Sequence, residues 1–145
     1  MTPLEGLPPH TVEPLAGRRI ATLRREARAA GHRLLHADCA DARDKAGVMA
    51  AIARGFGLPA HFGANLDALY DCLTDLDPAP GEGAAAGTGP GLVLVVEHLP
   101  GAPGFDEDAR DALLDVLRDA ADGFAGQGVA FRAFWSLSGA RRAPP

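Results

Sequence analysis

Residues Leu92–Val96, with the sequence Leu-Val-Leu-Val-Val, place the tightest limit on what this chain can fold into. A continuous apolar run of this kind is typical of a β-strand that is buried on both of its faces. Such strands occur in parallel sheets that helices cover on both sides. The run therefore predicts an α/β protein with a central strand at these residues.

Helices and strands alternate on either side of this run. Compact apolar segments predict two further strands, at residues 32–38 and 129–135. Apolar residues at helical spacing predict four helices: 18–30, one that begins after Asp41 or Asp44 and ends by 55–57, one that begins after Asn65, and 106–124. Strands separated by helices pair in parallel through right-handed crossovers. The expected fold is α/β, a small and mostly parallel sheet of about three strands with helices packed around it.

The length of 145 residues fits one domain. We expect that domain at 18–135, with a flexible insertion at 77–91, a flexible Pro-rich lead-in at 1–17 and a tail at 136–145. No apolar run reaches the roughly 18 residues of a membrane span, and the first residues do not resemble a signal peptide, so a cytoplasmic protein is expected. Two cysteines are too few for a disulfide scaffold.

Charge is distributed unevenly along the chain. The formal net charge is −5 overall, but it is +3 over Met1–Arg54, −11 over Gly55–Gly126 and +3 over Gln127–Pro145. The overall balance argues against a general nucleic-acid binder. A concentrated acidic segment attracts basic partners, although it is also compatible with an ordinary solvated surface.

The helix that begins after Asn65 concentrates this acidity. Asn is a preferred N-cap residue, which supports the helix start. Helical spacing places Leu66, Leu69, Leu73 and Leu76 on one face and Asp67, Asp71 and Thr74 on the opposite face. Like charges four residues apart disfavour a helix by roughly 0.2–0.5 kcal/mol. The pair Asp67 and Asp71 therefore belongs either to a functional surface or to an ordinary polar face of the helix.

The same residues admit other kinds of chemistry. A glycosidase needs carboxyl groups across a cleft, whereas Asp67 and Asp71 would point the same way. A metal site built from these two residues and His61 lacks any recognised ligand spacing, so no metal or cofactor is expected. An enzyme using the three residues remains an alternative, and it would turn over without a protein partner. Cys72 has no evident base partner, which favours a buried, inert thiol.

Residues 58–74 match, at every fixed position, the pattern L-P-x-x-F-G-x-N-L-D-A-L-x-D-x-L-T. This pattern resembles the signature of the barstar family, intracellular inhibitors of secreted microbial ribonucleases. A looser likeness extends from about Arg33 to Trp135. The resemblance implies a barstar-like fold and a non-enzymatic protein whose partner is a ribonuclease of the guanyl-specific, barnase-like type.

The resemblance also implies roles for individual residues. Asp71 would take the place of the substrate phosphate in the ribonuclease, and Asp67 would be a flanking anchor. Asn65 and Gly63 would shape the loop, and Asp119 matches a family Glu that touches the enzyme. His61, Tyr70 and Thr74 complete the expected partner-binding residues, His61 and Tyr70 as amphipathic contacts of the kind enriched at interfaces.

Three positions depart from the family pattern. The family has a Tyr where this chain has His61, a Trp where it has Leu76, and an acidic contact near Gly123. The expected function is a stoichiometric inhibitor whose acidic helix blocks the phosphate-binding active site of an extracellular ribonuclease. The alternative is a barstar-like module for another basic protein, such as a toxin nuclease or a regulator.

Overall fold

The computed structural model describes residues 10–59, 65–78 and 90–138. Within these ranges the elements follow one another in the order β1 (His10–Pro14), α1 (Ile20–Ala30), β2 (Arg33–Asp38), α2 (Lys45–Phe56), α3 (Leu66–Thr74), β3 (Gly91–Leu99), α4 (Glu107–Ala125) and β4 (Ala130–Leu137). The described helices contain no segment long and apolar enough to cross a membrane.

The strands form one parallel sheet in the order β1-β4-β3-β2. The α/β class and the parallel pairing are confirmed, but the sheet has four strands rather than about three. The additional strand is β1, which lies in the segment 1–17 where only a lead-in was expected. Its pairing with β4 continues into the following residue, because the Leu15 N–H donates to the Trp135 carbonyl at 2.6 Å.

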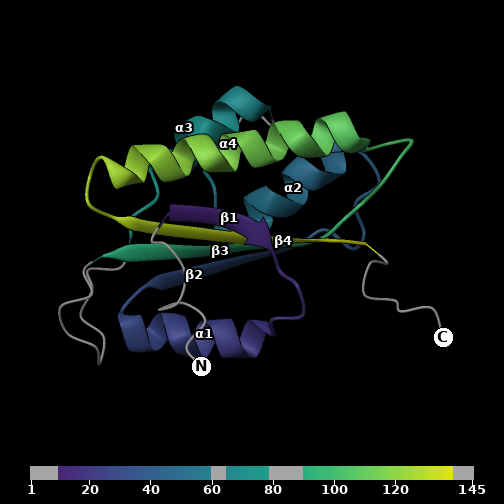
Figure 1. Cartoon of the computed structure of the whole chain (residues 1–145). Coiled ribbons are helices and arrows are strands. Elements are labelled where there is room, and N and C mark those ends of the chain that lie inside the picture. Colours follow the sequence, from purple (N-terminus) through teal and green to yellow (C-terminus); the bar gives the residue numbers. More distant parts are fainter. Residues whose placement is uncertain (1–9, 60–64, 79–89, 139–145) are drawn as a thin grey trace.

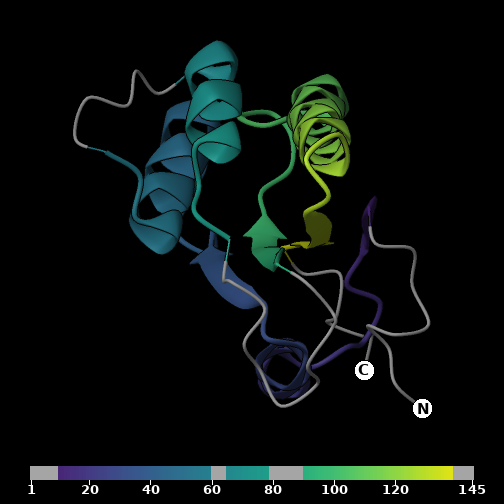
Figure 2. The same cartoon turned by 90° about the vertical axis from the view of Figure 1, so that its left-hand side faces the viewer.

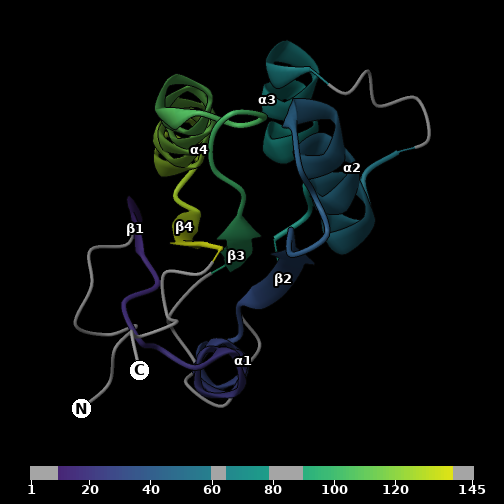
Figure 3. The same ribbon diagram turned by 90° about the vertical axis from the view of Figure 1, so that its right-hand side faces the viewer.

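Helices cover the two faces of the sheet unequally. Helices α2, α3 and α4 lie on one face and α1 lies alone on the other (Figure 1), as the end-on views show most clearly (Figures 2 and 3). Side chains of β3 alternate between the two layers: Leu92, Leu94 and Val96 join the larger core, and Val93 and Val95 pack with α1. All five are fully buried, which confirms the expectation of a strand covered on both faces.

Three helices begin with the same side-chain contact. Asp44 accepts from the Gly47 N–H at 2.8 Å, Asn65 from the Ala68 N–H at 2.8 Å, and Asp106 from the Ala109 N–H at 2.9 Å. Each bond satisfies a backbone donor that has no partner inside the helix. The alternatives Asp41 and Asp44 for the start of α2 are thereby resolved in favour of Asp44.

Helix α1 is amphipathic: one face is buried against the sheet and the other is exposed to solvent. Its residues Leu23 and Ala27 are buried and pack with Val93, Val95 and Phe134 of the sheet. Its exposed side chains include a group of arginines: Arg24, Arg25 and Arg28, with Arg19 just before the helix. The outer surface of this layer is therefore basic.

The remaining boundary predictions are only partly tested. Of the expected insertion 77–91, residues 79–89 lie outside the described residues, and Gly91 already belongs to β3. The expected tail 136–145 begins too early, since β4 runs to Leu137, and residues 139–145 lie outside the described part.

Candidate functional site

Helix α3 is held by its apolar face. Leu69 and Leu73 are fully buried in the larger core, and Leu66 and Leu76 pack against it while half-buried. On the other side Asp67 and Asp71 are exposed, as is Tyr70, whose side chain is a large ring on the surface. The division of this helix into two faces is confirmed.

The exposed side of α3 faces α4 across a shallow hollow. Its lining residues are Leu66, Asp67, Tyr70 and Asp71 from α3 and Val116, Asp119, Asp122 and Gly123 from α4. Four of these side chains are carboxylates and none is basic. The hollow thus combines the apolar side chains of Leu66 and Val116 with four negative charges, and two packed helices supply both.

Gly123 of α4 lies close to the side chains of α3 at one end of the hollow. A Cβ at this position would lie 3.7 Å from the hydroxyl of Tyr70 and 3.9 Å from Cγ2 of Thr74. The Thr74 hydroxyl donates within its own helix, 3.1 Å from the carbonyl oxygens of both Tyr70 and Asp71. Tyr70 and Thr74 therefore lie along the backbone of α4, and Thr74 borders the hollow without lining it.

The structure brings together Asp67, Tyr70, Asp71 and Asp119 of the expected partner-binding residues. Asn65 contributes as the cap that fixes the start of α3. His61 and Gly63 lie outside the described residues.

One lining residue that the sequence analysis missed is Asp122. It follows Asp119 by three positions, and residues three apart lie on the same face of a helix. The sequence therefore contained the signal, which could have added a second carboxylate from α4.

The electrostatics of the hollow suit cationic groups. Asp67 and Asp71 are one turn apart in α3, and Asp119 and Asp122 nearly one turn apart in α4. Arg118, a neighbour of Asp119 in the chain, instead pairs with Asp115 at 2.9 Å. Like charges this close cost the free protein stability, whereas guanidinium or ammonium groups of a partner would neutralise them with charge-assisted hydrogen bonds.

The two thiols are poorly suited to nucleophilic chemistry. Burial, together with the nearby Asp38 carboxylate, raises the pKa of Cys39 to about 11. Burial also raises the pKa of Cys72, with added contributions from Asp75 and Asp71. Nucleophilic cysteines require a lowered pKa. Cys72 is half-buried rather than fully buried, and its environment favours the protonated thiol.

A comparison with protein families decides the relationship. The model of the family described as barstar (barnase inhibitor) matches residues 32–136, which is more than half of the chain. The chain belongs to the barstar family. Its described barstar unit comprises β2, α2, α3, β3, α4 and β4, whereas β1 and α1 precede the matched range.

The hollow between α3 and α4, called the acidic hollow below, is lined only by residues inside the range that matches the barstar family. The family is that of an inhibitor and not of a catalyst, and barstar-family proteins bind barnase-like ribonucleases in general. Among curated proteins, none matches this chain closely enough to count as a relative.

Proposed function

We propose that this protein is a stoichiometric inhibitor of an extracellular guanyl-specific ribonuclease and that the acidic hollow covers the enzyme's phosphate-binding site. The observation that carries the proposal is the convergence of Asp67 and Asp71 with Asp119 and Asp122 on one face of a barstar-family protein. An active site built to hold RNA phosphates presents cationic side chains, and four clustered carboxylates offer it negative charge without a bond to cleave.

Asp71 has the central role in this proposal. It is exposed on α3, it lines the hollow together with Asp67 and the α4 carboxylates, and its helix is anchored by buried Leu69 and Leu73. A carboxylate presented on a rigid helix loses little conformational freedom when it binds. The resemblance assigns the phosphate-mimicking role to the same residue, with Asp67, Tyr70 and Asp119 around it and His61 and Gly63 in the preceding loop.

The proposed place of action is the cytoplasm, where the inhibitor would protect the cell from its own ribonuclease before that enzyme is exported. The chain would act by binding alone, in a complex with one molecule of enzyme, and would need no cofactor.

The test is a titration of purified guanyl-specific ribonucleases with the full chain, with RNA cleavage as the readout. Inhibition should be complete at equimolar protein. Asp71→Asn keeps the shape of the side chain and removes its charge, and it should weaken binding by about 2–5 kcal/mol if the charge is desolvated against a cation. Asp111→Asn is the matched control: it removes an exposed carboxylate from α4 outside the hollow. Unchanged RNA cleavage across a panel of such enzymes would refute the proposal.

The second candidate is a barstar-like module that binds another basic protein, such as a toxin nuclease or a regulator. It is favoured by Leu76, which packs half-buried against the core where the family pattern has a Trp. Affinity capture from the cell that makes the protein separates the two candidates. The second predicts a cationic partner without ribonuclease activity, retained by the natural chain and lost with Asp71→Asn.

A further inference from the structure

Strand β3 carries a bulge that turns two consecutive side chains to the same face. Val96 and Leu99 both pack in the larger core, although they are three positions apart and side chains of a regular strand alternate between faces. The pairing register between β3 and β4 shifts between the same two residues, and His98 has a φ of 62°. These are the marks of a β-bulge. Glu97 and His98 therefore both lie away from the layer of α2, α3 and α4.

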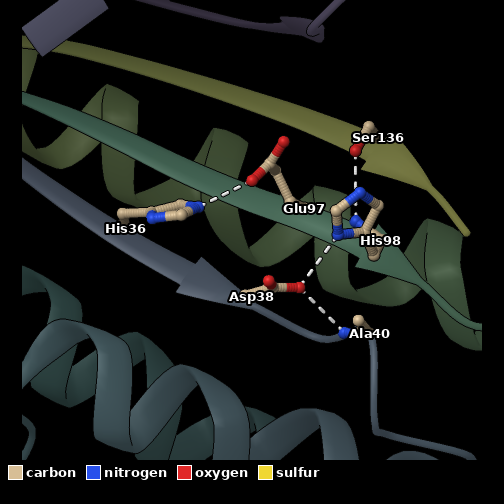
Figure 4. A network of polar contacts seen from close by, with 6 residues as sticks. All are labelled: His36, Asp38, Ala40, Glu97, His98 and Ser136. Carbon is tan, nitrogen blue, oxygen red and sulfur yellow. Dashed lines mark hydrogen bonds and ion pairs between the residues drawn. The ribbon is translucent and has the colours of Figure 1, made fainter. Parts of the chain in front are cut away.

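The bulge brings His98 next to the end of β2. Asp38 is the register partner of Glu97, and Nδ1 of His98 lies 2.9 Å from Oδ1 of Asp38 (Figure 4). One ligand atom from each of Asp38, Glu97 and His98 lies within 4.8 Å of the others. The cluster lies at the carboxyl ends of two parallel strands, which is where open α/β sheets bind ligands.

Bonds to neighbouring groups hold each of these side chains. The Ser136 hydroxyl accepts the backbone N–H of His98 at 3.1 Å and thereby fixes the left-handed residue, while Asp38 also accepts the N–H of Ala40 at 2.9 Å. Nε2 of His36 lies 2.8 Å from Oε1 of Glu97 (Figure 4). The side chains of His98 and Glu97 are 23% and 19% exposed and that of Asp38 is 52% exposed. All three side chains are thus partly open to solvent.

We propose that Asp38, Glu97 and His98 form a binding site for a divalent transition-metal ion, with Zn²⁺ as the best match. One imidazole nitrogen and two carboxylate oxygens are donors that Zn²⁺ accepts, and three protein ligands leave a fourth position for water. Mg²⁺ and Ca²⁺ prefer sets made only of oxygen atoms and more ligands than these. The ion takes the place of any proton between Nδ1 of His98 and Asp38, and the neutral imidazole then carries its one proton on Nε2.

His36 acts as a positioning residue in this site. By donating to the Glu97 carboxylate it would orient that ligand, in the way that outer hydrogen bonds orient the ligands of known metal centres. The site shares no residue with the acidic hollow, so its test is independent of the proposed inhibition.

The experiment is equilibrium dialysis of the tag-free full chain against Zn²⁺, with bound zinc measured per chain and the unfolding midpoint recorded with and without the ion. We expect one Zn²⁺ per chain and a higher midpoint in its presence. His98→Asn should weaken binding more than about 100-fold, and His36→Gln about tenfold. Asn is chosen at position 98 because it tolerates the left-handed backbone. Mg²⁺ at the same concentration should not bind.

Matched controls separate this site from other zinc ligands. His10→Asn removes a histidine that lies elsewhere, against the Val129 carbonyl, and should leave zinc binding unchanged. Cys72→Ser should also leave it unchanged. If His98→Asn does not give the natural circular dichroism spectrum, Glu97→Gln provides the same test. The proposal fails if the natural chain binds no zinc, if the cluster variants bind as the natural chain does, or if Cys72→Ser abolishes binding.

Discussion

Gly55 of α2 lies directly against Ala37 of β2: a Cβ at position 55 would come 2.6 Å from the Cα of Ala37. Both partners in this contact are backbone, so neither can give way by rotating a side chain. Gly55→Ala should therefore push α2 from the sheet and destabilise the protein by about 1–3 kcal/mol, the usual range for overpacking. Urea unfolding followed by circular dichroism measures the loss as a lower midpoint.

Gly123→Ala should have the opposite sign. This glycine also lies in a helix, but a Cβ there would make ordinary contacts of 3.7 Å with Tyr70 and 3.9 Å with Thr74. Replacing a helical glycine by alanine without a clash gains about 0.5–1 kcal/mol. The same urea experiment should show a higher midpoint, and a lower midpoint would contradict the packing described for α3 and α4.

Asn65→Ala should destabilise the helix that carries the central carboxylates. The side chain of Asn65 accepts the Ala68 N–H at 2.8 Å, and loss of such a cap costs about 1 kcal/mol. Asn65→Asp keeps an acceptor at the cap and should retain most of the stability. Thermal unfolding of the two variants compares their stabilities directly. Equal losses of stability would show that the hydrogen bond at the cap does not account for the effect of Asn65→Ala.

Leu23→Ala should destabilise the protein although it lies outside the range that matches the barstar family. Leu23 is completely buried between α1 and the sheet, and truncating such a leucine costs about 2–5 kcal/mol. Arg24→Ala, at the exposed neighbouring position, should change the free energy of unfolding by only about 0.5 kcal/mol or less. Similar midpoints for the two variants in urea would argue that α1 is not part of the folded unit.

The two thiols should react at very different rates with Ellman's reagent at pH 8. Cys39 is fully buried and its pKa is raised to about 11, so it should react only upon unfolding. Cys72 is half-buried and should react slowly in the native protein. A raised pKa lowers the fraction of reactive thiolate, and Asp75 contributes to raising that of Cys72. Asp75→Asn should therefore speed the labelling of Cys72 about twofold, the modest effect expected of a screened charge.

Elements with strong local signals were predictable from the sequence. The apolar run of β3, the cap at Asn65 and the spacing of Leu69 and Leu73 each follow from nearest neighbours in the chain, and the structure has them where they were expected. The approach of Asp119 to Asp71 is different, because it depends on how α4 packs on α3, and only the family resemblance suggested it.

Strand β1 and the cluster of Asp38, Glu97 and His98 could not be predicted from the sequence, and one physical reason explains both. His10–Pro14 has no alternating apolar pattern and becomes a strand only because β4 offers it an edge to pair with. His98 meets Asp38 only because a bulge reverses the facing of one residue, and a shift of one residue in a strand leaves no trace in local composition. Both features arise from contacts between distant parts of the chain.

The opposite charges of the two helical layers give the molecule an electric dipole moment across the sheet. Helix α1 lies on one side of the sheet and helices α3 and α4 on the other (Figure 1). The exposed arginines belong to the α1 layer, and the carboxylates of the hollow belong to α3 and α4. A strongly cationic protein approaching through solution would exert a torque on this arrangement before any atoms touch, turning the acidic side toward itself and the arginine side away. Productive encounters would then be favoured over random collisions, most strongly at low ionic strength.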